Sequence, residues 1–404
     1  MSLLPETRER TGFADQAEVD DFVRTLARFE RAEITADQWR AYRLVRGIYG
    51  QRQEGVQMVR CKIPQGILPA DQLRALAAVA RRYSRGFGHI TTRQNVQFHF
   101  VRQDDAPRAM RLLAEAGLTT REACGNSVRN ITACVYAGVA ADEVFDITPF
   151  AEACTRHLLR HPLSAVLPRK FKIAWEGCLG DHVALPIHDL GFWARRGQGG
   201  VPGFQVLVGG GTSILCRGAR EIEGFLPAED VLRIAEAVLR VYHQRGDYRH
   251  KQRNRLKFLI EEMGFASFAE EDRSVLGELR AEGGAELPFD ARRPPVEAAP
   301  PPRPAAPAAE AIAARVRREP PRGPGLLPVL EIDTQPSEAD LARWLRTNLR
   351  PQKQPGFSLA TVTVVLGDLT APQLEALAEL AVAYGDGTVR VTSEQNLVLR
   401  FVPT

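Results

Sequence analysis

The sequence predicts an α+β fold in which two copies of one unit form a pseudo-symmetric pair of half-domains beside a larger mixed α/β region. The first observation is an internal repeat, because residues 68–101 align without a gap with residues 369–402 and 15 of the 34 pairs are identical. The second is an alternation of probable strands and helices between the copies, over about 119–284. The third is a stretch at 288–328 that holds 12 of the 27 prolines.

The first 118 residues are interpreted as two segments. Residues 1–55 are a helical extension, and residues 56–118 hold the first repeat copy. Each copy is typical of a helix, a turn and a half-buried strand, and one helix face is apolar in both copies, carrying Leu73, Leu76, Ala77 and Ala80 in the first and Leu374, Leu377, Ala378 and Ala381 in the second. In the strand that follows, alternation predicts three side chains on the buried side and three on the other, namely Val96, Phe98 and Phe100 against Gln97, His99 and Val101.

The rest of the chain divides into three segments. Residues 119–284 form the mixed α/β domain, and residues 329–404 hold the second copy. Between them, residues 285–328 are expected to be an extended, semi-rigid linker with at most one short alanine-rich helical turn, because proline and alanine offer few side chains for a core. Two copies so far apart are too few for a solenoid.

Composition is that of a globular protein with a sizeable core, since 44% of the 404 residues are hydrophobic and 25% are charged. The N-terminus has no apolar signal region, and no apolar run approaches the roughly 18 residues of a membrane span, so we expect a cytoplasmic protein without a membrane partner. The six cysteines include no CxxC pair. They suggest neither a disulfide framework nor a zinc site, and no metal ligands are predicted from spacing; most are expected to be buried free thiols.

Positive charge is concentrated although the net charge is only +4. Six of the thirteen residues in 245–257 are Lys or Arg, and a second basic group lies at 168–172. Taken alone, the first run fits a solvated helix face about as well as an anion site. Nucleic-acid binding is the weaker alternative, because aromatic residues are sparse there and the overall charge is low.

Several cations lie on predicted strands. Arg60 and Lys62 share one side of a strand, as do Lys170 and Lys172, and Arg129 lies between two asparagines. Paired lysines on a core strand are costly unless they face an anion or a water-filled cavity, whereas on an edge strand they protect against aggregation. From the residues alone both interpretations of Lys170 and Lys172 stay open. The glycines at 209–211 lack nucleotide-binding spacing and indicate a tight turn or a close approach of backbone to a large flat ligand.

Six motifs in one order carry a resemblance: VRCKIPQG, ITTRQNVQFHF, GNSVRNITAC, LPRKFKIAWEGC, FQVLVGGGTSI and GDYRHKQRNRLKFLIEEMG. The sequence resembles the sirohaem-dependent nitrite and sulfite reductases. That resemblance implies two ferredoxin-like half-domains, which are the repeat copies, plus a larger mixed α/β sirohaem-binding domain. It also implies an oxidoreductase that reduces nitrite or sulfite by six electrons and receives them from a ferredoxin-type donor.

The resemblance implies roles for eleven residues. By motif position the four cations that hold the substrate above the haem iron and help to deliver protons are Arg60, Arg129, Lys170 and Lys172. The residues implied to bind the carboxylates of sirohaem are Thr91, Arg93, Gln97, His99, Arg253, Arg255 and Lys257. Arginine suits that task because its guanidinium binds carboxylates in a bidentate way.

One feature departs from the family pattern. The family's fourth module carries paired cysteines that bind a [4Fe-4S] cluster, and here no cysteine follows Cys216. We therefore expect this chain alone to be inactive, with the cluster supplied by a partner chain or by a part missing through truncation. The alternative is a non-catalytic anion-binding or tetrapyrrole-binding protein that retains the reductase scaffold.

Overall fold

The computed structural model describes residues 7–8, 12–297, 303–322 and 334–404. The chain divides into two compact units, which we treat separately. The mixed unit comprises Met1–Arg10, Leu44–Arg46 and Arg121–Ala298, and the repeat unit comprises Thr11–Arg43, Gly47–Thr120 and Ala299–Thr404. Among the described residues, no helix is both long enough and apolar enough to cross a membrane.

The repeat unit contains two five-stranded sheets that exchange strands. One has the order β15-β5-β6-β3-β2 and the other β13-β14-β17-β16-β4. The strands of the first copy are β2 (Ile48–Gly50), β3 (Val56–Cys61), β4 (Ile67–Pro69), β5 (Phe87–Ile90) and β6 (Val96–Arg102). Those of the second are β13 (Leu349–Pro351), β14 (Phe357–Val362), β15 (Asp368–Thr370), β16 (Thr388–Val391) and β17 (Leu397–Pro403). Because β15 pairs with β5 and β4 pairs with β16, each copy completes the sheet of the other.

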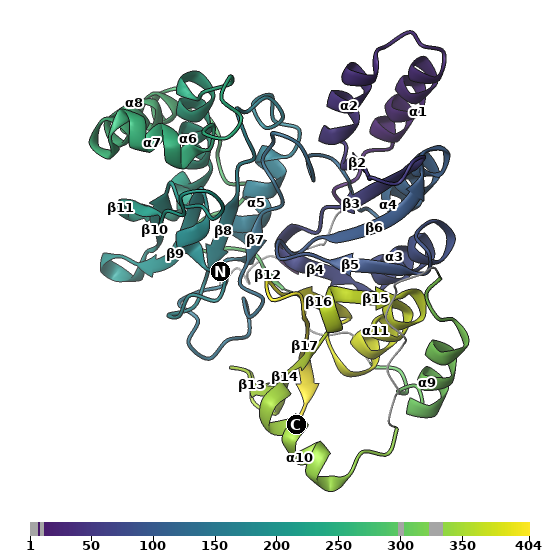
Figure 1. The fold of residues 1–404 in the computed structure, drawn as a ribbon. Coiled ribbons are helices and arrows are strands. Elements are labelled where there is room, and N and C mark those ends of the chain that lie inside the picture. Colours follow the sequence, from purple (N-terminus) through teal and green to yellow (C-terminus); the bar gives the residue numbers. More distant parts are fainter. Residues whose placement is uncertain (1–6, 9–11, 298–302, 323–333) are drawn as a thin grey trace. The chain divides into compact units, whose positions relative to one another are not determined.

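Helices of the two copies form the common core of this unit. Helix α3 (Ala70–Tyr83) packs against α11 (Ala371–Tyr384), as Figure 1 shows. All eight side chains predicted on the apolar faces are buried, which confirms the helical spacing. The remaining long helices near the copies are α1 (Gln16–Glu30), α2 (Ala36–Val45), α4 (Ala106–Glu115) and α10 (Glu338–Asn348).

The predicted alternation of the β6 side chains is wrong beyond Phe98. Phe100 has a φ of +61°, and the register with β3 shifts there, so Val101 is buried whereas Phe100 is only half-buried. The Phe100 amide donates to Oε1 of Gln51 at 2.6 Å. A β-bulge of this kind inserts one residue and reverses the inward side, which a strict period of two does not predict.

Part of the predicted linker is a packed helix, contrary to expectation. Helix α9 (Ala309–Arg318) spans ten residues, and it buries Ala313 and Val316 completely or nearly so. Arg315 donates to both carboxylate oxygens of Glu379 on α11, at 2.6 and 2.9 Å. Alanine has the highest helix propensity, so an alanine-rich stretch that contains a few apolar and basic residues can fold and dock. Residues 298–302 and 323–328 of that segment lie outside the described residues.

The mixed unit is built on one sheet of order β11-β10-β9-β8-β7. Its strands are β7 (Thr132–Ala133), β8 (Ile173–Glu176), β9 (Leu190–Arg196), β10 (Pro202–Val208) and β11 (Arg220–Pro227). Strands β7, β8 and β9 are parallel and the others antiparallel. Helices α5 (Thr148–Leu158), α6 (Val231–Arg245), α7 (Leu256–Met263) and α8 (Phe265–Ala281) share its core, in which Trp175 stacks on Phe192 at 4.0 Å between ring centroids. A two-residue pairing joins β1 (Thr7–Arg8) to β12 (Val296–Glu297).

Candidate anion-binding site

Lys170 and Lys172 lie just before β8 (Ile173–Glu176), which is an inner strand between β7 and β9. Both lysines are half-buried, whereas Phe171 between them is fully buried, so the two lysines share a side as predicted. The backbone of this stretch is bonded on both flanks, because the Phe171 amide donates to the Ser127 carbonyl and the Lys172 carbonyl accepts from Leu190. Protection of a sheet edge therefore does not explain these lysines.

Arg129 is held beside Lys170. The Arg129 amide donates to the Phe171 carbonyl at 2.8 Å, so the two chain segments run together. The Arg129 guanidinium donates to the neutral carbonyls of Gly125 and Ala123 at 2.9–3.2 Å. Burial lowers the pKa of Lys170, and the charges of Arg129 and of Arg255 lower it further. A half-buried ammonium surrounded by cations is stabilised when an anion binds.

Arg255 is bonded to a buried carboxylate. Its Nε and Nη2 donate to Oδ1 of Asp189 at 3.2 and 2.8 Å, and Nη2 also reaches Oδ2 at 2.8 Å. Both side chains are almost inaccessible, and Oδ2 of Asp189 also accepts from the Lys172 amide at 2.9 Å. Arg255 and Asp189 thus neutralise each other and orient the start of β8. Binding of a cofactor carboxylate by Arg255 stays a prediction.

Lys257 shapes a loop. Its Nζ donates to four backbone carbonyls between Gly211 and Leu215, at 2.8–3.3 Å. The glycines at 209–211 were expected to form a tight turn or to let backbone approach a large flat ligand. At Gly210 the close approach is to the chain itself, since a Cβ there would lie 2.2 Å from the carbonyl oxygen of Pro186. The loop exposes apolar side chains, with Ile214 61% and Leu215 46% exposed.

The chemistry of this region fits a polycarboxylate tetrapyrrole. A macrocycle of that kind presents an apolar face and a rim of negative charge, and the mixed unit offers the exposed apolar loop together with the cations Arg129, Lys170, Lys172 and Arg253. Arg253 is exposed just before α7. Its role and those of the other predicted cofactor-binding residues remain predictions.

In the repeat unit, four polar residues form one row across four strands. Two of them, Arg60 and Gln97, are predicted site residues, and the other two are His89 and Asp368. The register pairs Arg60 with Gln97, Gln97 with His89, and His89 with Asp368, over β3, β6, β5 and β15. Arg60 Nε donates to Oε1 of Gln97 at 2.8 Å, and His89 Nδ1 lies 2.8 Å from Oδ1 of Asp368. Three of the predicted residues, Arg60, Gln97 and His99, are therefore neighbours on one sheet face.

His99 lies beside this row. Its Nε2 is 3.5 Å from Nε2 of Gln97. Burial lowers the pKa of His99, and the charges of His89 and Arg60 oppose its protonation as well. His99 is therefore biased towards the neutral form, in which one ring nitrogen donates and the other accepts a hydrogen bond.

Thr91 and Arg93 belong to the turn that precedes β6. The Thr91 hydroxyl accepts from the amides of Asn95 at 3.2 Å and Arg93 at 3.3 Å. In the second copy the Thr392 hydroxyl accepts from the Asn396 amide at 3.1 Å. This shared bond gives Thr91 a structural role in the turn, and contact with a cofactor stays a prediction for both residues.

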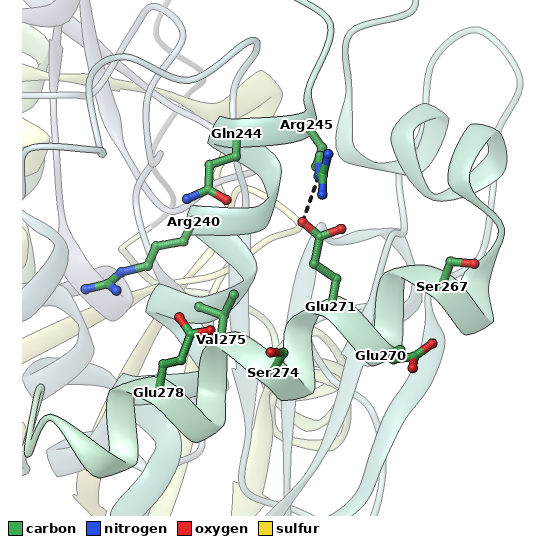
Figure 2. Close-up of a pocket in the computed structure, with 9 residues that line it drawn as sticks. All are labelled: Arg240, Gln244, Arg245, Ser267, Glu270, Glu271, Ser274, Val275 and Glu278. Atoms are coloured by element: carbon green, nitrogen blue, oxygen red, sulfur yellow. Dashed lines mark hydrogen bonds and ion pairs between the residues drawn. The ribbon is translucent and has the colours of Figure 1, made fainter.

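A pocket between α6 and α8 has the wrong charge for the predicted ligands. Figure 2 shows Glu270, Glu271 and Glu278 along it, with Arg245 bonded to Glu271 at 2.8 Å. With three glutamates and two arginines, one of them paired with Glu271, the lining carries net negative charge and offers no group of free cations for nitrite, sulfite or the rim of sirohaem. Its lining contains none of Arg129, Lys170 and Lys172, so this pocket is not the group of cations around Lys170.

The structure brings together one group that the sequence analysis missed. Cys134, Glu176, Cys178 and His182 each offer a ligand atom, and these atoms all lie within 4.8 Å of one another. Cysteine spacing suggested no metal site, and this group was not foreseen from it; five of the six cysteines are buried free thiols, as expected of most of them. The one available signal was a cysteine and a histidine four positions apart in the loop after β8.

Two family models match separate parts of the chain. The model described as "Nitrite/Sulfite reductase ferredoxin-like half domain" matches residues 49–116 and 350–404, which are the two repeat copies. The model described as "Nitrite and sulphite reductase 4Fe-4S domain" matches residues 124–278 in the mixed unit. The chain belongs to the nitrite and sulphite reductase family. The predicted fold class, with two ferredoxin-like half-domains and a larger mixed domain, is confirmed.

Similar proteins carry names from the same family. A ferredoxin–nitrite reductase of Leptolyngbya laminosa is 31% identical over 397 residues, which cover 96% of this chain and 66% of that protein. A sulfite reductase [ferredoxin] of Mycobacterium tuberculosis is 33% identical over 241 residues, covering 55% of this chain and 43% of that protein. The solved structure of the NirA protein of M. tuberculosis matches with a TM-score of 0.70 and 27% identity, over 92% of this chain and 61% of that chain. This family member therefore spans about two fifths to two thirds of the length of these relatives.

Proposed function

We propose that this chain is the substrate- and sirohaem-binding part of an enzyme that reduces nitrite or sulfite with electrons from a ferredoxin-type donor. The observation that carries the proposal is the group around Lys170, a half-buried lysine just before the inner strand β8, whose pKa is lowered by burial and by the charges of Arg129 and Arg255. Small oxyanions are the ligands that relieve this repulsion. The names of the similar proteins and the two family matches agree with the assignment.

The residues of the chain have separable tasks in this proposal. Sirohaem, when bound, would supply the iron at which the substrate is reduced and would pass on the six electrons that the ferredoxin-type donor provides. Lys172 and Arg129 add positive charge where the substrate oxygen atoms gain negative charge, which stabilises the transition state. Lys170 is suited to donate a proton, because burial and neighbouring cations lower its pKa and so make its ammonium a stronger acid than that of an exposed lysine. Asp189 and Arg255 position the lysines through the Lys172 amide.

The repeat unit contributes the row that contains Arg60. In the proposed enzyme Arg60 is the fourth cation that binds the substrate, and Gln97 orients its guanidinium. Thr91, Arg93, Gln97 and His99 are proposed to bind cofactor carboxylates from this unit, as Arg253, Arg255 and Lys257 are from the mixed unit. A cluster-bearing module is proposed to supply the electron relay.

Anion binding tests the proposal most directly. The chain would be expressed with a sirohaem source, and nitrite and sulfite would be titrated while the visible absorption of the cofactor is followed. Lys170→Gln is expected to raise the Kd by at least about tenfold, because hydrogen bonds to charged groups contribute about 1.5–3 kcal/mol. Lys251→Gln is the matched control, since Lys251 is exposed in the other basic run, and its Kd should not change.

Three outcomes of this experiment are informative. Tight anion binding that Lys170→Gln weakens, together with reduction once a cluster-bearing module and ferredoxin are added, supports the proposal. Sirohaem binding with no anion binding would instead identify a tetrapyrrole-binding protein without reductase activity. Equal Kd values for Lys170→Gln and Lys251→Gln would show that the Lys170 group is not the anion site.

A further inference from the structure

We infer that Cys134, Cys178, His182 and Glu176 form a structural zinc site at the carboxyl ends of β7 and β8. This site lies in the mixed unit and is independent of the proposed reductase activity. Cys134 directly follows β7, Glu176 ends β8, and Cys178 and His182 belong to the loop after β8. Because β7 and β8 are parallel neighbours, their carboxyl ends meet at the same edge of the sheet.

Three of the six distances between the ligand atoms match the edges of a zinc tetrahedron, and all six are within 4.8 Å. With Zn–S of about 2.3 Å and Zn–N or Zn–O of about 2.0–2.1 Å, tetrahedral geometry requires S···S of about 3.8 Å, S···N of about 3.5 Å and N···O of about 3.4 Å. The Sγ atoms of Cys134 and Cys178 are 3.8 Å apart, and Sγ of Cys134 is 3.6 Å from Nδ1 of His182. Nδ1 of His182 is 3.5 Å from Oε2 of Glu176. On these three edges an ion at the centre would contact Cys134, Cys178, His182 and Glu176 after at most small shifts of their side chains.

The carboxylate is positioned before any ion binds. Oε1 of Glu176 accepts from the amides of Gly177 and Cys178, both at 2.9 Å, and Oε2 accepts from the His182 amide at 2.6 Å. These bonds hold a fully buried carboxylate towards the thiols. Oε1 uses both of its lone pairs in the two amide bonds, whereas Oε2 keeps a second lone pair and can also bind a cation.

The loop that carries two of the ligands is itself braced. Asp181 accepts from the Val183 amide at 3.1 Å and from the Leu185 amide at 2.9 Å. The Trp193 indole on β9 donates to the Cys178 carbonyl at 2.9 Å. The ligand set is therefore largely preorganised, and little further ordering is needed when an ion binds.

Burial and access also fit a structural ion. Cys134 and Cys178 lie in a small apolar cluster of their own, whereas the His182 side chain is 30% exposed and gives a route to solvent. Two thiolates, an imidazole and a carboxylate favour zinc over magnesium or calcium, which prefer all-oxygen sites. A [4Fe-4S] cluster is held by four thiolates. Two groups of possible metal ligands occur among the described residues, and neither contains more than two cysteines.

A bound zinc ion would stabilise the edge of this sheet. Strand β7 has only two residues and lies at the edge, so its own ladder contributes few hydrogen bonds. Binding exchanges the two thiol protons for one zinc ion, and it ties β7 to the loop after β8. The second group, His157, His161 and Glu236, is a weaker candidate because Arg240 already binds Oε1 of Glu236 at 3.0 Å.

Metal analysis of the full chain tests this inference. Protein from zinc-supplemented medium, purified without chelator, is expected to carry about one zinc per chain. Cys134→Ser, Cys178→Ser and His182→Gln should each reduce zinc to background, whereas Cys216→Ser, which changes an exposed thiol, should leave it unchanged. Removing zinc with a strong chelator should lower the Tm of the wild type and not that of His182→Gln.

Two further measurements keep the test decisive if a cysteine variant fails to fold. Cobalt(II) added to metal-free wild type should produce the visible absorption of a tetrahedral site with thiolate ligands, and His182→Gln, a change at a partly exposed position, should weaken it at least about tenfold. Thiol titration of the denatured wild type should find six thiols. Four thiols, with a Cys134–Cys178 disulfide, would overturn the inference, as would six thiols with neither zinc nor the cobalt spectrum.

Discussion

The two repeat copies share a backbone and differ in chemistry. Positive φ angles recur 301 positions apart, at Gln65 and Leu366, Gln94 and Gln395, and Phe100 and Phe401. The hydrogen bonds that brace these turns recur as well. Oδ1 of the copy-1 asparagine, Asn95, accepts from the Ile63 amide at 3.2 Å, and that of Asn396 accepts from the Val364 amide at 2.9 Å. Side chains that bond to backbone are thus common to both copies.

Other side chains of the strands and turns differ between the copies. Arg60 and Gln97 of the first copy correspond to Thr361 and Val398 of the second, and Arg93 corresponds to Glu394. His99 corresponds to Arg400, which is fully buried and paired with Asp386. The shared bonds therefore brace the backbone turns of both copies, whereas the unshared positions form the polar row that contains Arg60, which we propose to bind anions, in one copy and a buried ion pair in the other.

Breaking the buried ion pair should have the largest effect on stability. Arg400→Met leaves the Asp386 carboxylate buried without its guanidinium, so we expect the free energy of unfolding to fall by about 3–5 kcal/mol. His99→Gln, the equivalent change in the first copy, should cost less than about 1 kcal/mol. Urea denaturation measures both. Similar losses in the two variants would show that the copies do not differ in the way described.

The same pair predicts acid sensitivity. Burial alone would raise the pKa of Asp386, but the charges of Arg400 and Arg390 outweigh burial and lower it to about 2. Because the folded pKa lies below the unfolded value, the stabilisation is present above about pH 4 and is lost as the pH falls towards 2; it amounts to about 2 kcal/mol. Unfolding free energies between pH 2 and 6 should decline less steeply for Asp386→Asn than for the wild type.

Substitutions in the row that contains Arg60 should affect anion binding, whereas substitutions at the corresponding positions of the second copy should not. In sirohaem-loaded protein, Arg60→Gln is expected to raise the Kd for nitrite or sulfite by about tenfold to hundredfold, since it removes a charged hydrogen-bond donor. Thr361→Val in the second copy should leave the Kd unchanged. An equal effect of both substitutions, measured by the same titration, would contradict a row confined to the first copy.

The shared asparagines should show graded effects. Asn95 is buried, so Asn95→Ala leaves the Ile63 amide without its acceptor and should cost about 1–2 kcal/mol. Asn396 is only half-buried, and water can replace part of its bond, so Asn396→Ala should cost about 0.5–1 kcal/mol. Thermal denaturation of both variants checks the order. A larger loss at Asn396 would mean that the second copy depends more on its turn than the first.

The smallest effects are expected at the bulges. Gln51 and Gln352 each accept from the amide of the bulged phenylalanine, at 2.6 and 2.9 Å. Replacement of either by alanine should cost about 0.5–1 kcal/mol, the net value of one hydrogen bond, and the two costs should agree within error. Hydrogen exchange at the Phe100 and Phe401 amides measures each bulge separately. Faster exchange at one site only would show that the two bulges are not equivalent.

Local patterns in the sequence determined much of this fold. The 301-residue repeat identified the two copies, and helical spacing identified the buried faces of α3 and α11. The alternation of Lys170, Phe171 and Lys172 predicted that the two lysines share a side, and the burial of Phe171 between two half-buried lysines agrees with it, because neighbouring side chains in an extended chain point to opposite faces. The motif order also indicated the family. Each of these inferences depends on residues that are close in sequence or identical between copies.

Only the tertiary structure decided which distant segments meet. Strand exchange pairs β4 with β16 across more than 300 residues, and the docking of α9 depends on Glu379 of α11. Cys134 and Cys178 are 44 positions apart, and only the parallel pairing of β7 with β8 places their sulfur atoms 3.8 Å from each other. Periodicity reports which face of an element is apolar, but the partner that covers this face is selected by packing of the whole chain, and no spacing within one segment encodes it.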